Sequence, residues 1–249
     1  MITIVTPVLN DISGLKKTLK SIELVDALEL VIVDGGSSDG SWEYAEKFSK
    51  HDNVSLIRQR SLGLYGAFND GISSARGQRV LFLYCGDITD ITSVLAVVKE
   101  NADNDIIACS CTQRSNEGDA SVYLRSKRPE ITGRSVSILH PSLIIKRDKY
   151  TQEGGFDESF KVSGDVDCIL RMISNGASVV YLDKVIVDMA PWGVSNRLYL
   201  RKLYEHSIIR SRRVGFFSAL SYMPKRLVKD FLLLPLWIRI RPFLREENY

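Results

Sequence analysis

The sequence has 249 residues, of which 45% are hydrophobic, enough for one large domain or one domain with a small appendage. It begins MITIVTPVLND, without the basic segment, long apolar run and cleavage site of a signal peptide, so we expect a cytoplasmic globular protein. The net charge of +3 is unevenly distributed, because residues 197–249 carry twelve Lys or Arg and four Asp or Glu, which leaves −5 on the first 196 residues.

Short β-branched runs alternate with helical patterns in the first half, which predicts βαβ units and a mostly parallel central sheet flanked by helices. Asn10 or Asp11 can cap the first helix, which carries Leu15, Leu19 and Ile22 on one face. We expect strands at 2–5, 28–33, 54–57 and 79–84, and further helices at 42–48 and 65–75.

The second half is less regular and contains one clear helix. That helix begins near Ser163 and ends at Asn175-Gly176, a common C-terminal signal. The sequence therefore predicts an α/β domain over residues 1–196 and a short basic, amphipathic helical tail over residues 197–249. Further strands are expected at 106–111, 121–125, 142–145 and 178–187.

The cysteines form no CxxC pair. Cys109 and Cys111 are two residues apart in an expected strand and share one of its faces. We expect buried, reduced thiols rather than a metal site for all four, Cys85, Cys109, Cys111 and Cys168.

Polar segments follow three of the expected parallel strands: TPVLN (6–10), DGGSSD (34–39) and CGD (85–87). Ligands of an open parallel sheet bind at this carboxyl edge. The G-x-G-x-x-G spacing and the GxxxxGK[ST] motif are both absent from the sequence, which disfavours a dinucleotide or phosphate-loop enzyme. The carboxylates at this edge could contact a nucleotide base and hold a metal ion near phosphates. A nucleotide sugar is a ligand that needs both.

Four segments carry a family resemblance: TPVLND, LVIVDGGSSDGS, GLYGAFNDGISSARGQRVLFLYCGD, and GGFDESFKVSGDVDCILRMISNG followed by PWGVSN. In this order and spacing they resemble the inverting family 2 glycosyltransferases, particularly those that build bacterial exopolysaccharide, O-antigen and colanic acid. The resemblance implies a GT-A fold. It also implies transfer of a sugar from a nucleotide-diphosphate donor, usually a UDP-sugar, to a saccharide or polyprenyl-linked saccharide.

In that family the aspartate matching Asp34 contacts the base, because a carboxylate accepts the ring N–H of uracil. The alternative is a turn residue ahead of GGSS, the role we expect of Asp39. Ser61, Leu62 and Gly66 stand where relatives often carry aspartates, which leaves the donor sugar open. The nucleotide-binding residues implied by the resemblance are Thr6, Pro7, Val8, Asn10, Asp34, Gly66 and Asn69.

The aspartate matching Asp87 ends the DxD-like motif of the family, which is reduced here to CGD. A divalent cation, Mg²⁺ or Mn²⁺, would bridge this carboxylate and the diphosphate and neutralise the charge on the leaving group. The alternative is that Asp87 caps a helix before Ile91.

Inversion needs a base that removes the proton of the attacking hydroxyl group. Asp165 matches the family's catalytic aspartate, although Gly164 precedes it where many relatives have an acid. The alternative for Asp165 is stabilisation of the helix dipole, the role we favour for Asp167, which could otherwise contact a sugar. His140 could face the cleft or be structural, and Trp192 could stack on a sugar or be buried.

The tail combines apolar residues with basic ones, a pattern typical of segments that lie on a membrane surface. Its longest apolar run is too short to span a bilayer, so we expect peripheral attachment to the inner face of the cell membrane. The alternatives are a tail packed on the domain and, less favoured still, nucleic-acid binding, so no nucleic acid is expected as a partner. A non-catalytic nucleotide-sugar binding protein and a sugar-phosphate nucleotidyltransferase remain alternative functions.

Overall fold

The computed structural model describes residues 1–114, 121–126, 139–191 and 198–215. Trp192, which could stack on a sugar or be buried, lies outside this part of the chain, and so do residues 216–249, which make up most of the tail expected at a membrane surface. The chain divides into two compact units, 1–197 and 198–249, and in the second the structure describes the helix α8 (Tyr199–Val214). None of the described helices is long and apolar enough to cross a membrane.

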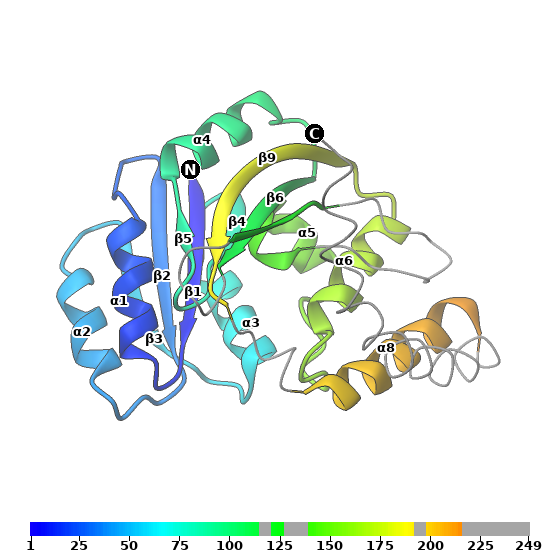
Figure 1. Cartoon of the computed structure of the whole chain (residues 1–249), viewed down its shortest axis with the longest axis horizontal. Coiled ribbons are helices and arrows are strands. Elements are labelled where there is room, and N and C mark those ends of the chain that lie inside the picture. Colours follow the sequence, from blue (N-terminus) through cyan, green and yellow to red (C-terminus); the bar gives the residue numbers. More distant parts are fainter. Residues whose placement is uncertain (115–120, 127–138, 192–197, 216–249) are drawn as a thin grey trace, which may run out of the picture. The chain divides into compact units, whose positions relative to one another are not determined.

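Within the described residues, nine strands form one sheet, with helices on both faces (Figure 1). The strands are β1 (Ile2–Val8), β2 (Leu28–Asp34), β3 (Val54–Arg58), β4 (Arg79–Phe82), β5 (Ile88–Thr89), β6 (Ile106–Arg114), β7 (Ser121–Leu124), β8 (Leu143–Lys146) and β9 (Val179–Met189). The helices of the first unit are α1 (Ile12–Ser21), α2 (Ser41–Phe48), α3 (Leu64–Ser74), α4 (Ile91–Glu100), α5 (Arg147–Gln152) and α6 (Gly164–Ser174), with a 3-10 helix η1 (His140–Ser142).

The strand order is β3-β2-β1-β4-β8-β6-β9-β5, and β7 pairs with β6. The first four strands of this order are parallel, β8 runs antiparallel to both of its neighbours, and β9 is parallel to β6. The predicted α/β fold with a mostly parallel sheet is confirmed. At the carboxyl edge Val8 pairs with Asp34, and Asp34 pairs with Arg58, so the ends of β1, β2 and β3 are level.

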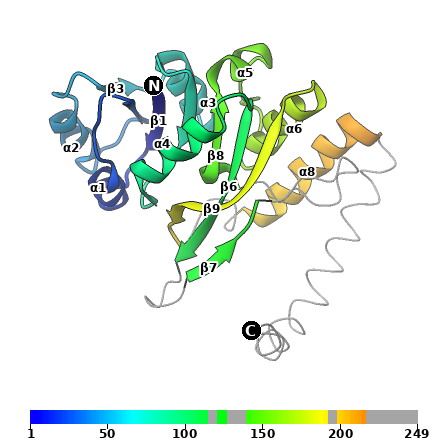
Figure 2. The ribbon, with the colours of Figure 1, turned by 90° about the horizontal axis from the view of Figure 1, so that it is seen from above.

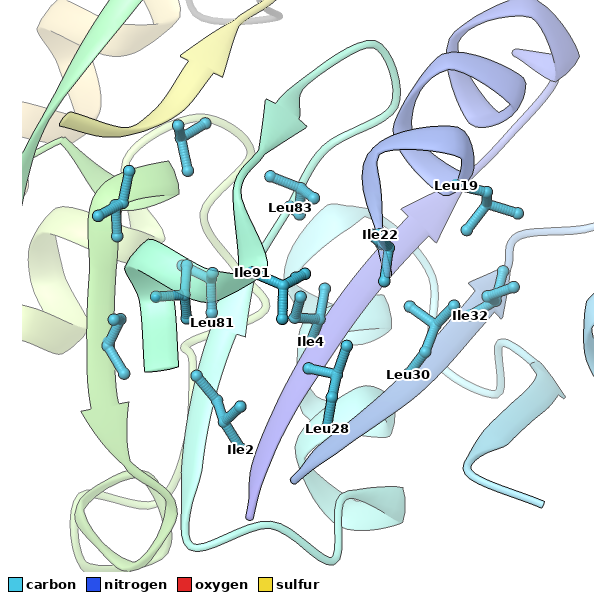
Figure 3. Packing of buried hydrophobic residues seen from close by; sticks show 14 of the residues in the cluster. Ile2, Ile4, Leu19, Ile22, Leu28, Leu30, Ile32, Leu81, Leu83 and Ile91 are labelled. Carbon is cyan, nitrogen blue, oxygen red and sulfur yellow. The ribbon is translucent and has the colours of Figure 1, made fainter. Parts of the chain in front are cut away.

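One face of the parallel strands packs against α1, α2 and α4 (Figure 2). Figure 3 shows Ile4, Leu30 and Leu81 of three neighbouring strands next to Leu19 of α1 and Ile91 of α4. These five side chains are at most 4% exposed, and each contributes about 1.5–3 kcal/mol through its burial. Because alternate side chains of a strand share one face, Ile4, Leu30 and Leu81 together form the apolar surface that these helices cover.

The opposite face carries α3 and α5 (Figure 2). Aromatic rings of these elements and of β4 pack together there. The centroids of Phe68 of α3 and Phe82 of β4 are 4.3 Å apart, and both rings stack on His140, at 5.2 and 5.1 Å. α3 lies close to β1 because Gly71 has no Cβ that would collide with Val5. This packing fixes the position of α3, whose first turn reaches the carboxyl edge.

The elements β5, α4, η1 and α5 are additions to the strands and helices expected from the sequence. β5 has two residues, and α5 has six, RDKYTQ, without an apolar period. Asp11 caps α1, and Asp90 rather than Asp87 caps α4, because the Asp90 carboxylate accepts from the first amides of that helix. The helix-cap alternative for Asp87 is therefore wrong.

All four cysteines are free thiols. Cys109, Cys111 and Cys168 are buried, as predicted, whereas Cys85 is half-buried. Burial raises the pKa of Cys168 to about 12, so this thiol remains protonated at neutral pH.

Candidate active site

The loops after β1 and β2 are joined by hydrogen bonds. The amide of Ser38 donates to Oδ1 of Asn10 (2.8 Å), and the amide of Asn10 donates to Oγ of Ser37 (3.0 Å). Asn10 has a φ of 51°, in the left-handed region that asparagine tolerates better than most residues. Asp39 accepts from the amide of Ile12 (2.8 Å), which confirms its expected role in the turn. The two loops therefore form one clasp at the edge of the sheet.

Asp34, the last residue of β2, is completely buried. Its Oδ1 accepts from the amides of Gly36 and Ser37, at 2.9 and 3.0 Å, so it does stabilise the turn. Its Oδ2 has no hydrogen-bond partner among the described residues, and the same holds for the buried hydroxyl of Thr6. Burying a carboxylate oxygen without a hydrogen-bond donor costs free energy, so Oδ2 can readily accept a hydrogen bond from an N–H group of a ligand.

Arg58 and Trp42 were not expected at the site. Arg58, at the end of β3, forms an ion pair with Asp34. Its guanidinium group lies over the ring of Trp42 of α2, 3.7 Å from the centroid. The pairing of Asp34 with Arg58 depends on the register of β2 and β3. This register cannot be derived from the pattern of apolar residues, so the sequence did not predict the ion pair.

Pro7 and Val8 contribute backbone atoms at the end of β1. The carbonyl oxygen of Val8 accepts from the amide of Gly35 (2.8 Å), and that of Pro7 accepts from Sγ of Cys85 (3.4 Å). Burial raises the pKa of the Cys85 thiol well above its usual range, and nearby carboxylates, Asp87 among them, raise it further. The ends of β1, β2 and β4 therefore meet.

Asp87 is buried, with 3% of its surface exposed. Its Oδ1 accepts from the amide of Ala190 (2.8 Å) and its Oδ2 from the amide of Tyr84 (3.3 Å). Burial raises the pKa of Asp87 to about 6, although these hydrogen bonds and the charge of Arg114 oppose the shift. In the described part of the chain, no group of three or more His, Cys, Asp or Glu side chains is placed to hold a metal ion.

The loop that carries Asp87 is held from two sides. The hydroxyl of Thr18 of α1 lies 3.0 and 2.8 Å from the carbonyl oxygens of Tyr84 and Asp87, and it accepts from the amide of Gly86 (2.9 Å). Arg114 of β6 donates to the carbonyl oxygen of Gly86. The loop is thus fixed by side chains that the sequence analysis did not single out.

Asp165 lies in the first turn of α6 and is half-buried. Its Oδ1 accepts from the hydroxyl of Tyr65 (3.1 Å), and Oδ2 has no hydrogen-bond partner among the described residues. Tyr65 belongs to the first turn of α3, which begins soon after β3 ends. Burial raises the pKa of Tyr84, and the charges of Asp165 and then Asp87 raise it further, so both carboxylates act on one tyrosine.

His140 is enclosed by the aromatic cluster. Its Nδ1 lies 2.9 Å from the hydroxyl of Tyr84, and its Nε2 has no partner among the described residues. Burial lowers the pKa of His140, which keeps the imidazole neutral at neutral pH. These contacts hold the imidazole ring in place between the aromatic rings and Tyr84.

Gly66, Asn69 and Asp167 all make contacts within the protein. Gly66 leaves room for the loop after β3, which a Cβ would meet at 2.7 Å. The side chain of Asn69 exchanges two hydrogen bonds with the backbone of Phe156, at 3.0 and 2.9 Å. Asp167 forms an ion pair with Arg171 one turn later, at 2.9 Å, which is a contact that stabilises the helix. Gly66 and Asn69 both belong to α3, and their contacts hold this helix against the loop after β3 and against Phe156.

Comparison with known proteins gives matches to sugar-transferring enzymes. The family model described as glycosyl transferase family 2 matches residues 3–164. The PGL/p-HBAD biosynthesis glycosyltransferase of Mycobacterium bovis is 26% identical over 232 residues, with 86% of each chain covered. The cholesterol galactosyltransferase of Borreliella burgdorferi is 35% identical over 85 residues, 33% of this chain and 24% of that one.

Two groups of solved structures share the fold. S. aureus TarS in complex with UDP superposes with a TM-score of 0.64 at 18% identity, covering 92% of this chain and 71% of that chain. The mannosyltransferase PcManGT from Pyrobaculum calidifontis, in complex with GDP-Man and Mn²⁺, gives a TM-score of 0.65 at 20% identity. That match covers 89% of this chain and 69% of the mannosyltransferase chain.

Proposed function

Because the chain belongs to glycosyltransferase family 2 and has the GT-A fold, we propose that it transfers a sugar, with inversion, from a UDP-sugar to a saccharide or lipid-linked saccharide. We assign this reaction to the synthesis of a bacterial surface polysaccharide. One observation carries the proposal most strongly: Asp34 and Asp165 each keep one carboxylate oxygen without a protein partner among the described residues.

The nucleotide is assigned to the clasp at the ends of β1 and β2. Oδ2 of Asp34 would accept the ring N–H of uracil, while Thr6, Pro7, Val8 and Asn10 would line the base and ribose. Guanine also presents an N–H group on its pairing edge. Since the solved relatives include complexes with UDP, UDP-GlcNAc and GDP-Man, both nucleotides enter the test.

Asp87 is the residue we assign to a divalent cation, Mg²⁺ or Mn²⁺. Its fit rests on burial, which raises the pKa of Asp87 to about 6, because an adjacent cation would offset the cost of its buried charge. Mg²⁺ is commonly held by one or two carboxylates together with substrate phosphates and water. When bound, the ion supplies positive charge for the leaving diphosphate.

Asp165 is the residue we assign as general base. The acceptor oxygen forms a bond to the anomeric carbon while the bond from that carbon to the diphosphate oxygen breaks, and the acceptor's proton passes to Oδ2 of Asp165. The nucleoside diphosphate leaves with the electron pair of the broken bond. The half-buried position of Asp165 gives it access to a substrate while limiting water.

The tail is assigned to the inner face of the membrane. It carries twelve Lys or Arg and four Asp or Glu over residues 197–249, and each basic group near an anionic surface contributes on the order of 1 kcal/mol. Such attachment would bring the domain close to a lipid-linked acceptor.

A donor screen tests the function. The full chain is incubated with UDP-glucose, UDP-galactose, UDP-GlcNAc or GDP-mannose in Mg²⁺ or Mn²⁺, with and without polyprenyl-linked saccharides, and the released nucleotide is measured. We expect a nucleoside diphosphate and a product of inverted anomeric configuration. Release of pyrophosphate from a nucleoside triphosphate and a sugar phosphate would indicate a nucleotidyltransferase, and donor binding without turnover a binding protein.

A further inference from the structure

Tyr65 and Asp165 are 100 residues apart in the chain and are joined by one hydrogen bond. The hydroxyl of Tyr65 donates to Oδ1 of Asp165 over 3.1 Å. Tyr65 is 2% exposed, so this hydroxyl has little access to water and is directed at the carboxylate. The bond uses one oxygen of Asp165 and leaves the other for a substrate.

The ring of Tyr65 is held by its neighbours. It lies nearly parallel to Phe156, with centroids 5.7 Å apart and planes at 22°, and edge-on to Phe68, also at 5.7 Å. A Cβ on Gly164 would come within 2.8 Å of the ring. Glycine immediately before Asp165 therefore allows the backbone of α6 to lie against the ring.

We propose that Tyr65 is a positioning residue for Asp165, and that Gly164 is the glycine that this arrangement requires. The inference rests on the proposed role of Asp165 as the base. By holding Oδ1, Tyr65 restricts rotation of the carboxylate and directs Oδ2 toward the acceptor hydroxyl. Near-attack geometry is sensitive to such restriction.

Tyr65 acts as a donor and takes no proton. Burial, followed by the charge of Asp165, raises the pKa of Tyr65 far above its usual range, so the hydroxyl stays protonated at any working pH. The other titratable groups that feel Asp165 are Tyr84, Tyr150, His140 and Cys168. Burial holds all four of these groups neutral near pH 7, so none of them adds a charge next to Asp165 at that pH.

The test compares Tyr65→Phe with Tyr150→Phe in the full chain. Tyr150 is a control from the same aromatic cluster, since it is buried and its hydroxyl has no partner among the described residues.

With the donor found in the screen, we expect Tyr65→Phe to lower kcat by about 10-fold to 100-fold, with donor KM unchanged. This is the effect of losing a hydrogen bond to a charged group. The pH–rate profile of both variants is recorded as well, because a mere loss of packing should not move it. Tyr150→Phe should keep the parent kcat and profile.

A second variant, Gly164→Ala, keeps the hydroxyl and crowds the ring, and it should also lower kcat at unchanged donor KM. If Tyr65→Phe fails to fold, the result for Gly164→Ala decides: parent kcat in a folded Gly164→Ala protein overturns the proposal. It is equally overturned if Tyr65→Phe matches Tyr150→Phe in kcat and pH profile while Asp165→Asn is inactive. An active Asp165→Asn variant would instead refute the assignment of the base itself.

Discussion

The guanidinium group of Arg58 stacks on the indole ring of Trp42, 3.7 Å from its centroid. The same group is ion-paired with Asp34, so three side chains from β3, α2 and β2 form one unit beside the proposed base pocket. Asp34 is buried whereas half of the Arg58 side chain is exposed. The ion pair therefore supplies charge to the buried carboxylate without blocking Oδ2, which is still unpartnered among the described residues.

Asp34→Asn should weaken the binding of UDP at least about 10-fold, measured by isothermal titration calorimetry. The amide oxygen can still accept from Gly36 and Ser37, but the NH₂ group replaces the acceptor that uracil needs. The melting temperature should fall by less than about 4 °C. Asp90→Asn is the control, because asparagine caps α4 equally well. Unchanged UDP affinity in Asp34→Asn would return Asp34 to its turn role alone.

Asp87→Asn should stabilise the metal-free protein at pH 8 and abolish transfer. The folded-state pKa of Asp87, about 6, lies above the unfolded value, so the folded state binds the proton more tightly. Stability consequently falls as the pH rises from about 4 to 6, by on the order of 3 kcal/mol, and that cost persists at higher pH. Guanidinium unfolding in EDTA should show a gain for Asp87→Asn at pH 8 that disappears near pH 4. A variant less stable than the parent at both pH values contradicts this.

Asp165→Asn and Asp167→Asn should separate catalysis from stability. Asp165→Asn should reduce transfer by roughly 10²-fold to 10⁴-fold at unchanged UDP affinity, the usual effect of losing a general base. Asp167→Asn should weaken the contact with Arg171, cost about 1–2 kcal/mol of unfolding free energy, and keep kcat within about threefold of the parent. Kinetics and thermal melting of both variants are the measurement, and the reverse pattern would exchange their roles.

Gly71→Ala should destabilise the protein by about 1–3 kcal/mol, because the new methyl group would collide with Val5 under α3. The higher helix propensity of alanine alone would raise the free energy of unfolding by about 1 kcal/mol. A decrease would therefore show that the packing against Val5 outweighs helix propensity. Ser73→Ala, at an exposed position of the same helix, should be neutral or slightly stabilising. Denaturant unfolding of both variants decides, and a more stable Gly71→Ala protein would show that α3 is not held this close to β1.

Replacing Arg239, Arg241 and Arg245 by Gln should weaken co-sedimentation of the full chain with phosphatidylglycerol-containing vesicles. At on the order of 1 kcal/mol per charge, the loss is about 100-fold at low salt. In the control, Gln replaces Lys16, Lys17 and Lys20, three exposed lysines of α1, so that the net charge changes by the same amount. An equal loss in both proteins would mean that net charge, not the tail, attracts the vesicles.

The sequence was sufficient for the parallel half of the fold because buried parallel strands are continuous apolar runs, as in LELVIVD of β2. It was insufficient for β5, which has two residues, and for the reversed direction of β8, since direction depends on connections in space. Asp34 and Asp87 were singled out because they follow the ends of expected parallel strands, and Asp165 because it matches the catalytic aspartate of the family that the sequence resembles. Tyr65 and Arg58 were missed because their partners are 100 and 24 residues away.

The clasp of Asn10 with Ser37 and Ser38 has a consequence for the energetics of binding. Ordering a loop backbone costs about 1–2 kcal/mol of conformational entropy per residue. In these loops, hydrogen bonds of the free protein have already restricted the backbone, so a nucleotide bound at the proposed site would lose little affinity to chain ordering. This half of the proposed site would then be a preorganised receptor, in which the freedom lost on association is mainly that of the ligand.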